Sequence, residues 1–389
     1  MAEPTIEYSM FLIFSGAAIL ATLALFARQA MIVAYIILGI ILGPWGLGLV
    51  TDPALIKDVS NIGIIFLLYL LGLDLFPQQL WSMLGKALTT TLLSSLVFWF
   101  LGFAVGWMFG YQMRESMLLG SALMFSSTII GVKLLPTTIL HHKHTGQIII
   151  SVLLLQDLIA IIILLLLQGF GEGGNLLLDI FIQIITLPFL VLIAWVLERY
   201  ILVKLIAKFD QIHEYIFLLA IAWCLGISEL AGVLGLSHEI GAFTAGVTLA
   251  SSPIAFFITE KLKPLRDFFL IIFFFALGAT FNMDVIDVLI LPALLLAVSV
   301  ILFKPLVFRF LFTHAGETPA ISLEVGFRLG QISEFSMLIA VLAVESGFIG
   351  VQASYLIQLA ALLTFIISSY IIVLRYPTPI AISDKLRRD

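Results

Sequence analysis

Apolar stretches of about 20 residues follow one another along almost the whole chain, and this pattern restricts the fold more than any other feature. Hydrophobic residues make up 62% of the 389 residues and charged residues 11%, whereas soluble domains average roughly 45–50% and about 25%. This composition excludes a soluble multidomain enzyme. The net charge of −5 and the lack of a basic face argue against nucleic-acid binding. We therefore expect an all-α polytopic membrane protein embedded in a lipid bilayer.

The apolar stretches predict 13 transmembrane helices, and the alternative is twelve with one re-entrant segment. They cover residues 8–26, 30–43, 57–76, 86–110, 115–138, 146–168, 175–198, 213–231, 237–252, 265–281, 285–312, 319–347 and 351–375. The first basic residue, Arg28, follows the first stretch, which predicts an uncleaved span with its N-terminus outside. With this orientation 15 of the 19 basic residues fall on the inner side, together with the C-terminus. Only Lys57 and Arg114 fall outside, and Lys304 and Arg328 fall within spans.

Asp157 is the sharpest functional candidate because it lies in the middle of an apolar span. A carboxylate at that depth favours its protonated form unless a cation lies beside it, so the same oxygen can hold either H⁺ or a metal cation. The neighbouring Gln156 adds a neutral carbonyl oxygen, and this donor set suits a monovalent ion better than a divalent one. The alternative is an acid that is permanently paired with a helix-packing partner.

Lys304 is a second ionisable residue within a span. It is predicted to compensate the charge of Asp157 in the ion-free state, since an ammonium in the membrane needs an acid or carbonyl partners. The alternative is that its side chain reaches toward the inner surface, where Arg309 follows in the sequence.

Two spans are interrupted by polar residues and glycines. Ser126, Ser127 and Thr128 place three hydroxyls in a row, which either bond back to helix carbonyls or line an opened turn and offer oxygens to an ion. The second interruption follows Glu324, and its side chains either line an opened helix or join neighbouring helices. The residues predicted to line that opening are Arg328, Gly330, Gln331, Ser333 and Glu334. Glu324, Arg328 and Gln331 are spaced to share one helical face.

Interruptions at equivalent places in two halves predict two inverted six-helix repeats with crossed discontinuous helices. Repeat one covers about 8–168, a linker helix about 175–198 and repeat two about 213–375, within a single transmembrane domain of residues 1–389. Residues 376–389 are expected to form a short cytoplasmic tail. A separate histidine-rich loop, with His141, His142 and His144, either binds metal, senses pH or is simply solvated.

Six short stretches carry a resemblance to a known family. They are Gly43-Pro44-Trp45-Gly46-Leu47, Leu71-Gly72-Leu73-Asp74, Ser126-Ser127-Thr128, Leu154-Leu155-Gln156-Asp157, Gly241-Ala242-Phe243 with Ala245-Gly246, and Gly330-Gln331-Ile332-Ser333-Glu334-Phe335. Through them the chain resembles the bacterial monovalent cation:proton antiporters of the Kef type. The resemblance implies the sodium/proton antiporter fold, a homodimer, and a core domain of spans 4–6 and 11–13 that moves in an elevator-like cycle. It also implies a multi-pass protein of the bacterial inner membrane.

The resemblance further implies that Gln156 and Asp157 form the cation and proton site. Glutamine in place of a second acid is similar to the potassium-type members, and exchange at one carboxylate would be electroneutral. Gated members carry a C-terminal nucleotide-binding regulatory domain, and this sequence ends without one. The explanations are an ungated protein, a separate regulatory subunit or a shortened chain.

We therefore expect a transporter rather than an enzyme, exchanging K⁺ for H⁺ with a role in pH homeostasis. Its only bound species would be the transported ions, with no cofactor and no structural metal. The alternatives are a Na⁺/H⁺ antiporter, and a channel-like or gated K⁺ efflux system that needs a separate subunit. A sodium-coupled symporter and a non-transporting sensor are further alternatives on the same fold.

Overall fold

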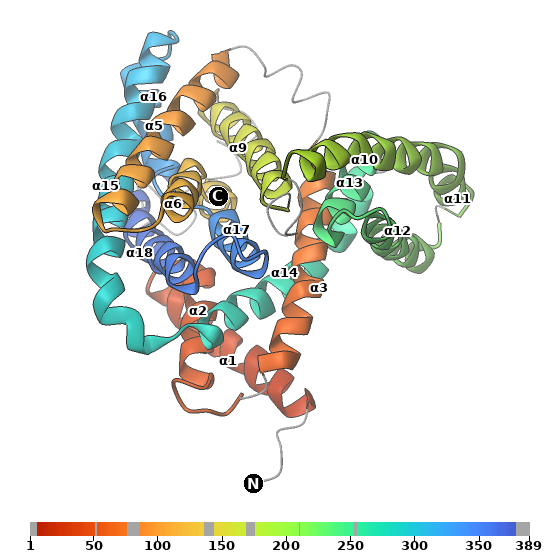
Figure 1. Cartoon of the computed structure of the whole chain (residues 1–389), viewed down its shortest axis with the longest axis horizontal. Coiled ribbons are helices and arrows are strands. Elements are labelled where there is room, and N and C mark those ends of the chain that lie inside the picture. The colour runs from red at the N-terminus through yellow and green to blue at the C-terminus, as the bar shows by residue number, and fades with distance from the viewer. Residues whose placement is uncertain are drawn as a thin grey trace. The chain divides into compact units, whose positions relative to one another are not determined.

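The computed structural model describes residues 6–50, 53–75, 86–135, 144–168, 176–209, 211–252 and 255–378. All regular elements in these ranges are helical, and most of them are labelled in Figure 1. They are α1 (Ile6–Phe26), α2 (Met31–Leu42), α3 (Pro53–Asp74), α5 (Lys86–Met108), α6 (Met113–Met124), α7 (Thr128–Lys133), α9 (His144–Gln168), α10 (Leu176–Leu197), the π-helical turn η1 (Glu198–Leu202), α11 (Val203–Lys208), α12 (His213–Val233), α13 (His238–Ala250), α14 (Ala255–Thr280), the 3₁₀ turn η2 (Met283–Val285), α15 (Ile286–His314), α16 (Pro319–Arg328), α17 (Glu334–Glu345) and α18 (Val351–Arg375).

Each predicted span coincides with a helix in the described residues or, for the two interrupted spans, with a pair of short helices. Span 115–138 is divided into α6 and α7, and span 319–347 into α16 and α17. The prediction of discontinuous helices at these two places is confirmed. Of the predicted tail, 376–389, only residues 376–378 lie within the described ranges.

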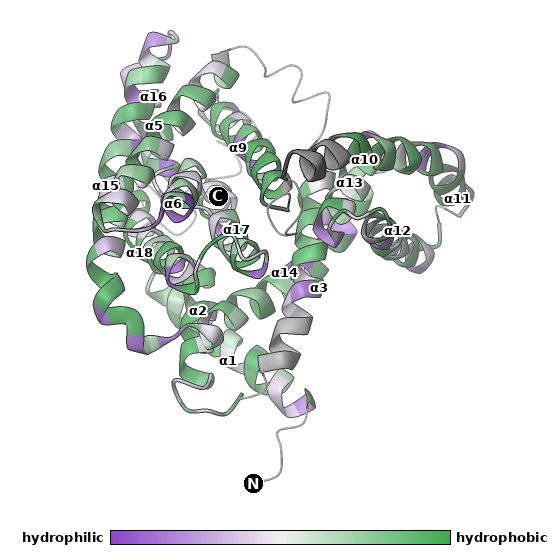
Figure 2. Cartoon of the chain, viewed as in Figure 1, coloured by the Kyte–Doolittle hydropathy of each residue, from purple (hydrophilic) through white to green (hydrophobic). Residues whose placement is uncertain are grey.

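Six helices in the described part of the chain are long and apolar enough to cross a membrane by themselves. They cover Ile6–Phe26, Ala87–Met108, His144–Leu164, Glu214–Val233, Met283–His314 and Val351–Arg375. Figure 2 shows hydrophobic residues along most of their length. Large apolar side chains such as Leu291 and Phe310 are more than half exposed, as expected for helices that face lipid. The protein is therefore a multi-pass membrane protein.

One boundary differs clearly from its prediction. α14 begins at Ala255, whereas hydropathy placed the start of that span near residue 265. The additional turns carry Glu260, Lys261 and Lys263, which end the apolar pattern, and Lys263 pairs with Glu260 on the helix surface. Helical hydrogen bonding does not depend on hydropathy, so the helix continues beyond the apolar segment.

The chain divides into two compact units. Unit 1 comprises Met1–Ser15, Leu38–Trp81 and Gln168–Thr280. Within it α3 packs against α13 and α14, and α12 packs against α13. Small residues bring these backbones together: a Cβ added to Gly246 of α13 would lie 2.9 Å from the Cα of Gly72 in α3. The rings of Phe66 and Phe269 stack at 5.1 Å between α3 and α14.

Unit 2 comprises Gly16–Ile37, Ser82–Leu167 and Phe281–Asp389. Within it α15 packs against α5, α16 and α18, while α17 packs against α6 and α18 (Figure 1). Unit 2 therefore contains spans 4–6 and 11–13, the spans that the family resemblance assigns to a core domain. Both divided helices and α9, which carries Asp157, lie within this one unit.

Candidate ion-binding site

The two helix openings meet in the middle of unit 2. α6 ends at Met124, and its C-cap Phe125 is extended, with φ −92° and ψ 149°. α16 ends at Arg328, and the chain becomes helical again only after Ser333. The Ser126 hydroxyl donates a 2.9 Å hydrogen bond to the Leu329 carbonyl, across 203 positions of sequence. The opened segments 125–127 and 329–333 therefore cross each other.

Lys304 of α15 fills the crossing and has no exposed surface. Its ammonium donates to the carbonyls of Phe125 at 2.7 Å and Gln331 at 2.8 Å, and to the Ser126 hydroxyl at 3.1 Å. These bonds use all three donors of an ammonium. Phe125 is the C-cap of α6, and carbonyls at a helix C-terminus carry partial negative charge, so a cation there stabilises the end of α6. The Gln331 carbonyl belongs to the segment between α16 and α17. In this arrangement the Lys304 donors are directed to neutral oxygens of the two openings.

α9 carries Gln156 and Asp157, whose exposed fractions are 1% and 3%, and Gln156 lies at the first opening. The Gln156 Oε1 accepts a 2.9 Å hydrogen bond from the backbone N–H of Ser126. Because that N–H can only donate, the amide oxygen of Gln156 must face the opening. Its Nε2 is buried without a hydrogen-bond partner among the described residues. The buried carboxylates in those residues are Asp157, Glu198 and Glu334, and two of the three lie in unit 2.

The three adjacent hydroxyls of the first interruption have different roles. Ser126 accepts from Lys304 and donates to the Leu329 carbonyl. The Ser127 hydroxyl accepts from the Ile130 N–H at 3.1 Å, and so satisfies a free donor at the start of α7. The Thr128 hydroxyl is buried without a partner in the described part of the chain. Thr128 therefore retains the free oxygen, whereas Ser126 and Ser127 stabilise the opened backbone.

Gln331 joins the two openings. Its Nε2 donates to the carbonyls of Ser127 at 3.3 Å and Arg328 at 3.0 Å. Because α16 ends at Arg328, Gln331 lies beyond the helical face that the spacing assigned to it. Ser333 caps α17 by accepting from the Phe335 N–H, and Glu334 is the first residue of that helix. Gly330 lies between Gln331 and the end of α16. We call the following residues the polar core: Ser126, Ser127, Thr128, Gln156, Asp157, Lys304, Arg328 and Gln331.

Arg328 is fully buried and joins three elements. Its guanidinium donates to Glu324 at 2.9 Å, to the Leu134 carbonyl after α7 at 3.1 Å, and to the Pro377 carbonyl after α18 at 2.9 Å. The predicted i,i+4 spacing of Glu324 and Arg328 thus forms an ion pair. Charged residues within membrane spans almost always pair with one another or with backbone carbonyls, and Arg328 does both.

Some residues of this region were not singled out from the sequence. The hydroxyls of Thr364 and Ser368 in α18 contact the second opening, and the Ser336 hydroxyl donates to the Ala122 carbonyl at 2.6 Å. The Phe98 ring lies 5.4 Å from the Lys304 ammonium. The available signal was the spacing of Thr364 and Ser368, which lie four positions apart in a largely apolar helix.

The histidine-rich loop is only partly described, because His141 and His142 lie outside the described residues. His144, at the start of α9, contacts the Glu317 carboxylate at 3.0 Å. No group of three or more His, Cys, Asp or Glu side chains is placed to hold a metal in the described ranges.

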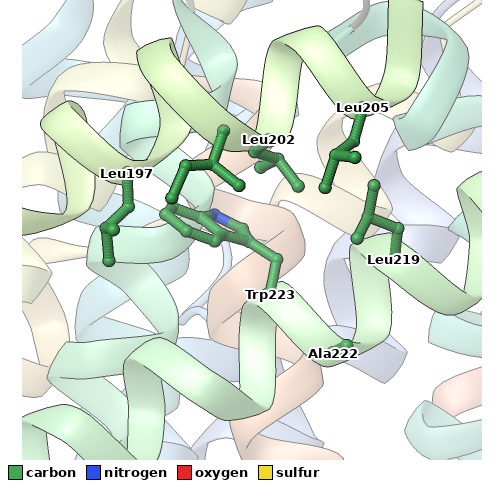
Figure 3. Close-up of a pocket in the computed structure, with 7 residues that line it drawn as sticks. Leu197, Leu202, Leu205, Leu219, Ala222 and Trp223 are labelled. Carbon is green, nitrogen blue, oxygen red and sulfur yellow. The ribbon is translucent and has the colours of Figure 1, made fainter. Parts of the chain in front are cut away.

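Unit 1 contains a pocket of about 260 Å³ between α10, η1, α11 and α12 (Figure 3). Its lining is apolar, with Leu197, Leu205, Leu219 and Trp223 among the contributing side chains. The indole N–H of Trp223 donates to the Ala245 carbonyl at 3.0 Å. This pocket offers no oxygen set for a cation, unlike the polar core of unit 2.

Comparison with known proteins identifies the family. Residues 12–374 match the model of the family described as "Sodium/hydrogen exchanger, transmembrane". Similar curated proteins include the iron transporter MagA of Paramagnetospirillum magneticum, 28% identical over 88% of this chain and 79% of that protein. K(+) efflux antiporter 5 of Arabidopsis thaliana is 30% identical, and the glutathione-regulated potassium-efflux system protein KefC of Klebsiella pneumoniae is 28% identical. These matches cover 80% and 84% of this chain.

The chain spans about half the length of these two potassium-efflux proteins, 56% and 54% respectively. Among solved structures, the sodium proton antiporter MjNhaP1 of Methanocaldococcus jannaschii, determined at pH 8, superposes with a TM-score of 0.69. The superposition covers 94% of this chain and 95% of that one at 17% sequence identity, so it establishes a shared fold. The family model covers residues 12–374, which is most of the chain, and the chain therefore belongs to the sodium/hydrogen exchanger family of transmembrane proteins.

Proposed function

We propose that this protein exchanges a monovalent cation for H⁺ and that its preferred cation is K⁺. In this proposal Asp157 binds the cation and the proton alternately. The observation that carries the proposal is the position of Gln156 and Asp157 on α9, with Gln156 hydrogen bonded to the opened segment of α6–α7. The Asp157 carboxylate is buried one position along α9 from Gln156, and Gln156 contacts backbone that has left its helical hydrogen bonding. Irregular backbone at membrane depth is typical of ion sites in secondary transporters.

The charges around the site support competition between one cation and one proton. Lys304 and Arg328 are both fully buried in unit 2, and they donate hydrogen bonds to carbonyls, a hydroxyl and Glu324. A transported cation would add positive charge to this region, and Asp157 can compensate it only in its ionised form. Taking up a proton would neutralise the same carboxylate and release the cation.

The polar core supplies few free oxygens for the cation. The Thr128 hydroxyl is without a partner in the described residues, and Gln156 Oε1 has one occupied lone pair and one free. One carboxylate with neutral oxygens suits a weakly hydrated monovalent ion. K⁺ is favoured by the names of the two potassium-efflux proteins described above. Na⁺ is the second candidate, favoured by the family name.

The wider proposal follows from the family resemblance. The protein would work as a homodimer in a bacterial inner membrane, with its N-terminus outside and its C-terminus in the cytoplasm. Unit 2 would act as the moving core of an elevator-like cycle.

The test is a flux assay in proteoliposomes that contain an internal pH dye, with K⁺, Na⁺, Li⁺ or choline added in turn. The wild type should respond to K⁺ above Na⁺, and Asp157→Asn should lose the response. Asp287→Asn is the matched control, since Asp287 is an exposed acid at the start of α15 in the same unit.

Each outcome has a distinct meaning. Cation-dependent proton flux in Asp157→Asn would reject the assignment of the site. A larger response to Na⁺ than to K⁺ would select the sodium alternative. A wild type that responds to no cation while it is correctly folded would reject exchange itself.

A further inference from the structure

α18 places two hydroxyl side chains against the second helix opening. Thr364 and Ser368 are one helical turn apart and share a face of the helix. Their exposed fractions are 0% and 2%, so no water competes for their hydrogen bonds. Their partners are residues of the opened segment 329–333.

Thr364 replaces a hydrogen bond that the opening removes from the backbone. Ile332 lies between α16 and α17, and its N–H donates to the Thr364 Oγ1 at 3.0 Å. Thr364 in turn donates its own proton to the Ala361 carbonyl at 2.8 Å. Because that proton is committed, an acceptor lone pair of Thr364 is held toward Ile332.

Ser368 fixes the orientation of the Gln331 amide. Its hydroxyl donates to the Gln331 Oε1 at 3.0 Å, which leaves the Nε2 to donate to the carbonyls of Ser127 and Arg328. If the amide were flipped, its oxygen would face these two carbonyls without a donor between them. Ser368 therefore controls the hydrogen bond from Gln331 to the Ser127 carbonyl, which joins the two openings, although Ser368 takes no part in that bond.

We propose that Thr364 and Ser368 are positioning residues for the ion site. They hold Ile332 and Gln331 so that the two opened segments keep the crossing that faces Gln156. This inference rests on the proposed function, because it concerns the geometry of the same site. Substitution of Thr364 or Ser368 leaves Asp157 in place. The oxygens that surround the cation are therefore affected more than the carboxylate that binds the proton.

The first test measures exchange at a series of K⁺ and Na⁺ concentrations. Ser368→Ala and Thr364→Val should raise the apparent KM for the cation by about threefold to tenfold, as expected for one lost hydrogen bond. The maximal rate should change less, and Thr364→Ser should restore the wild-type KM because it keeps the hydroxyl.

Ser369→Ala is the matched control. Ser369 is the next residue of α18, is 1% exposed, and its hydroxyl has no partner among the described residues. It should retain the wild-type KM. Equal KM values in Ser368→Ala, Thr364→Val and Ser369→Ala would overturn the proposal.

A second readout does not require transport. Hydrogen exchange of the Ile332 amide should be faster in Thr364→Val than in Ser369→Ala, with both proteins monodisperse in the same membrane mimetic. Unchanged protection would overturn the role of Thr364 even if the wild type shows no exchange activity. If the wild type transports no cation but the Ile332 amide still exchanges faster in Thr364→Val, the proposed function would be rejected and the positioning role of Thr364 would stand.

Discussion

Single side chains in the polar core differ in how many of their polar atoms are already hydrogen bonded. Lys304 uses all three donors on Phe125, Ser126 and Gln331, whereas Gln156 keeps a free Nε2. Removing a saturated residue leaves buried partners unsatisfied, which costs more than the bond itself contributes. Lys304 is therefore the residue on which the crossing depends most.

We predict that Lys304→Leu is strongly destabilising. The change leaves two buried carbonyls and one hydroxyl without their charged donor, and we expect a loss of about 3–5 kcal/mol. The apparent melting temperature in a fixed detergent or nanodisc measures the effect. Arg309→Leu is the control, because Arg309 is an exposed residue of the same helix. A melting temperature of Lys304→Leu as high as that of Arg309→Leu would contradict this role.

Whole helices in unit 2 are held at distances that only small residues allow. Gly326 of α16 faces Pro305 of α15, and a Cβ added there would lie 2.6 Å from the Pro305 Cα. Pro305 directly follows Lys304, so the spacing between these helices also sets the reach of the ammonium to the Gln331 carbonyl. Helix packing and site geometry are therefore coupled.

Gly326→Ala should push α16 away from α15. Since the clash is with backbone atoms, we expect about 1–3 kcal/mol of destabilisation, together with slower exchange. Gly226→Ala in α12 is the matched control, because an added Cβ there would meet no described atom within 4 Å beyond its chain neighbours and the nearby backbone of its own helix. It should be neutral or stabilise by up to about 1 kcal/mol. Equal melting temperatures and equal exchange rates in the two variants would show that the approach of α15 to α16 is unimportant.

The existence of the helices could be predicted from hydropathy, and the two openings from polar residues and glycines inside apolar spans. The boundary of α14 could not, because charged turns such as those around Lys261 end the apolar pattern without ending the helix. The partners of Lys304 also could not be predicted. They depend on which helices touch, and Phe125 lies 179 positions away. Thr364 and Ser368 were missed for the same reason.

At the scale of the molecule, the chain combines an uneven charge distribution with two internally packed units. Both opened helices, α9 and α18 belong to unit 2, so the whole candidate site is built within one body. The basic residues are concentrated in the loops predicted to be cytoplasmic. This asymmetry sets the orientation of a membrane protein during insertion, and the orientation determines which helix ends face the cytoplasm.

We predict that the connection between α5 and α6 is outside and that between α11 and α12 is inside. Cys224 is buried and is the single cysteine of the chain, so single-cysteine variants can be made in a Cys224→Ala background. A membrane-impermeant maleimide should label Met113→Cys in intact cells, because Met113 is exposed at the start of α6. Gln211→Cys should be labelled only after the membrane is permeabilised. The reverse labelling pattern would show that the protein has the opposite orientation in the membrane. Labelling of both positions in intact cells would contradict an odd number of spans between them.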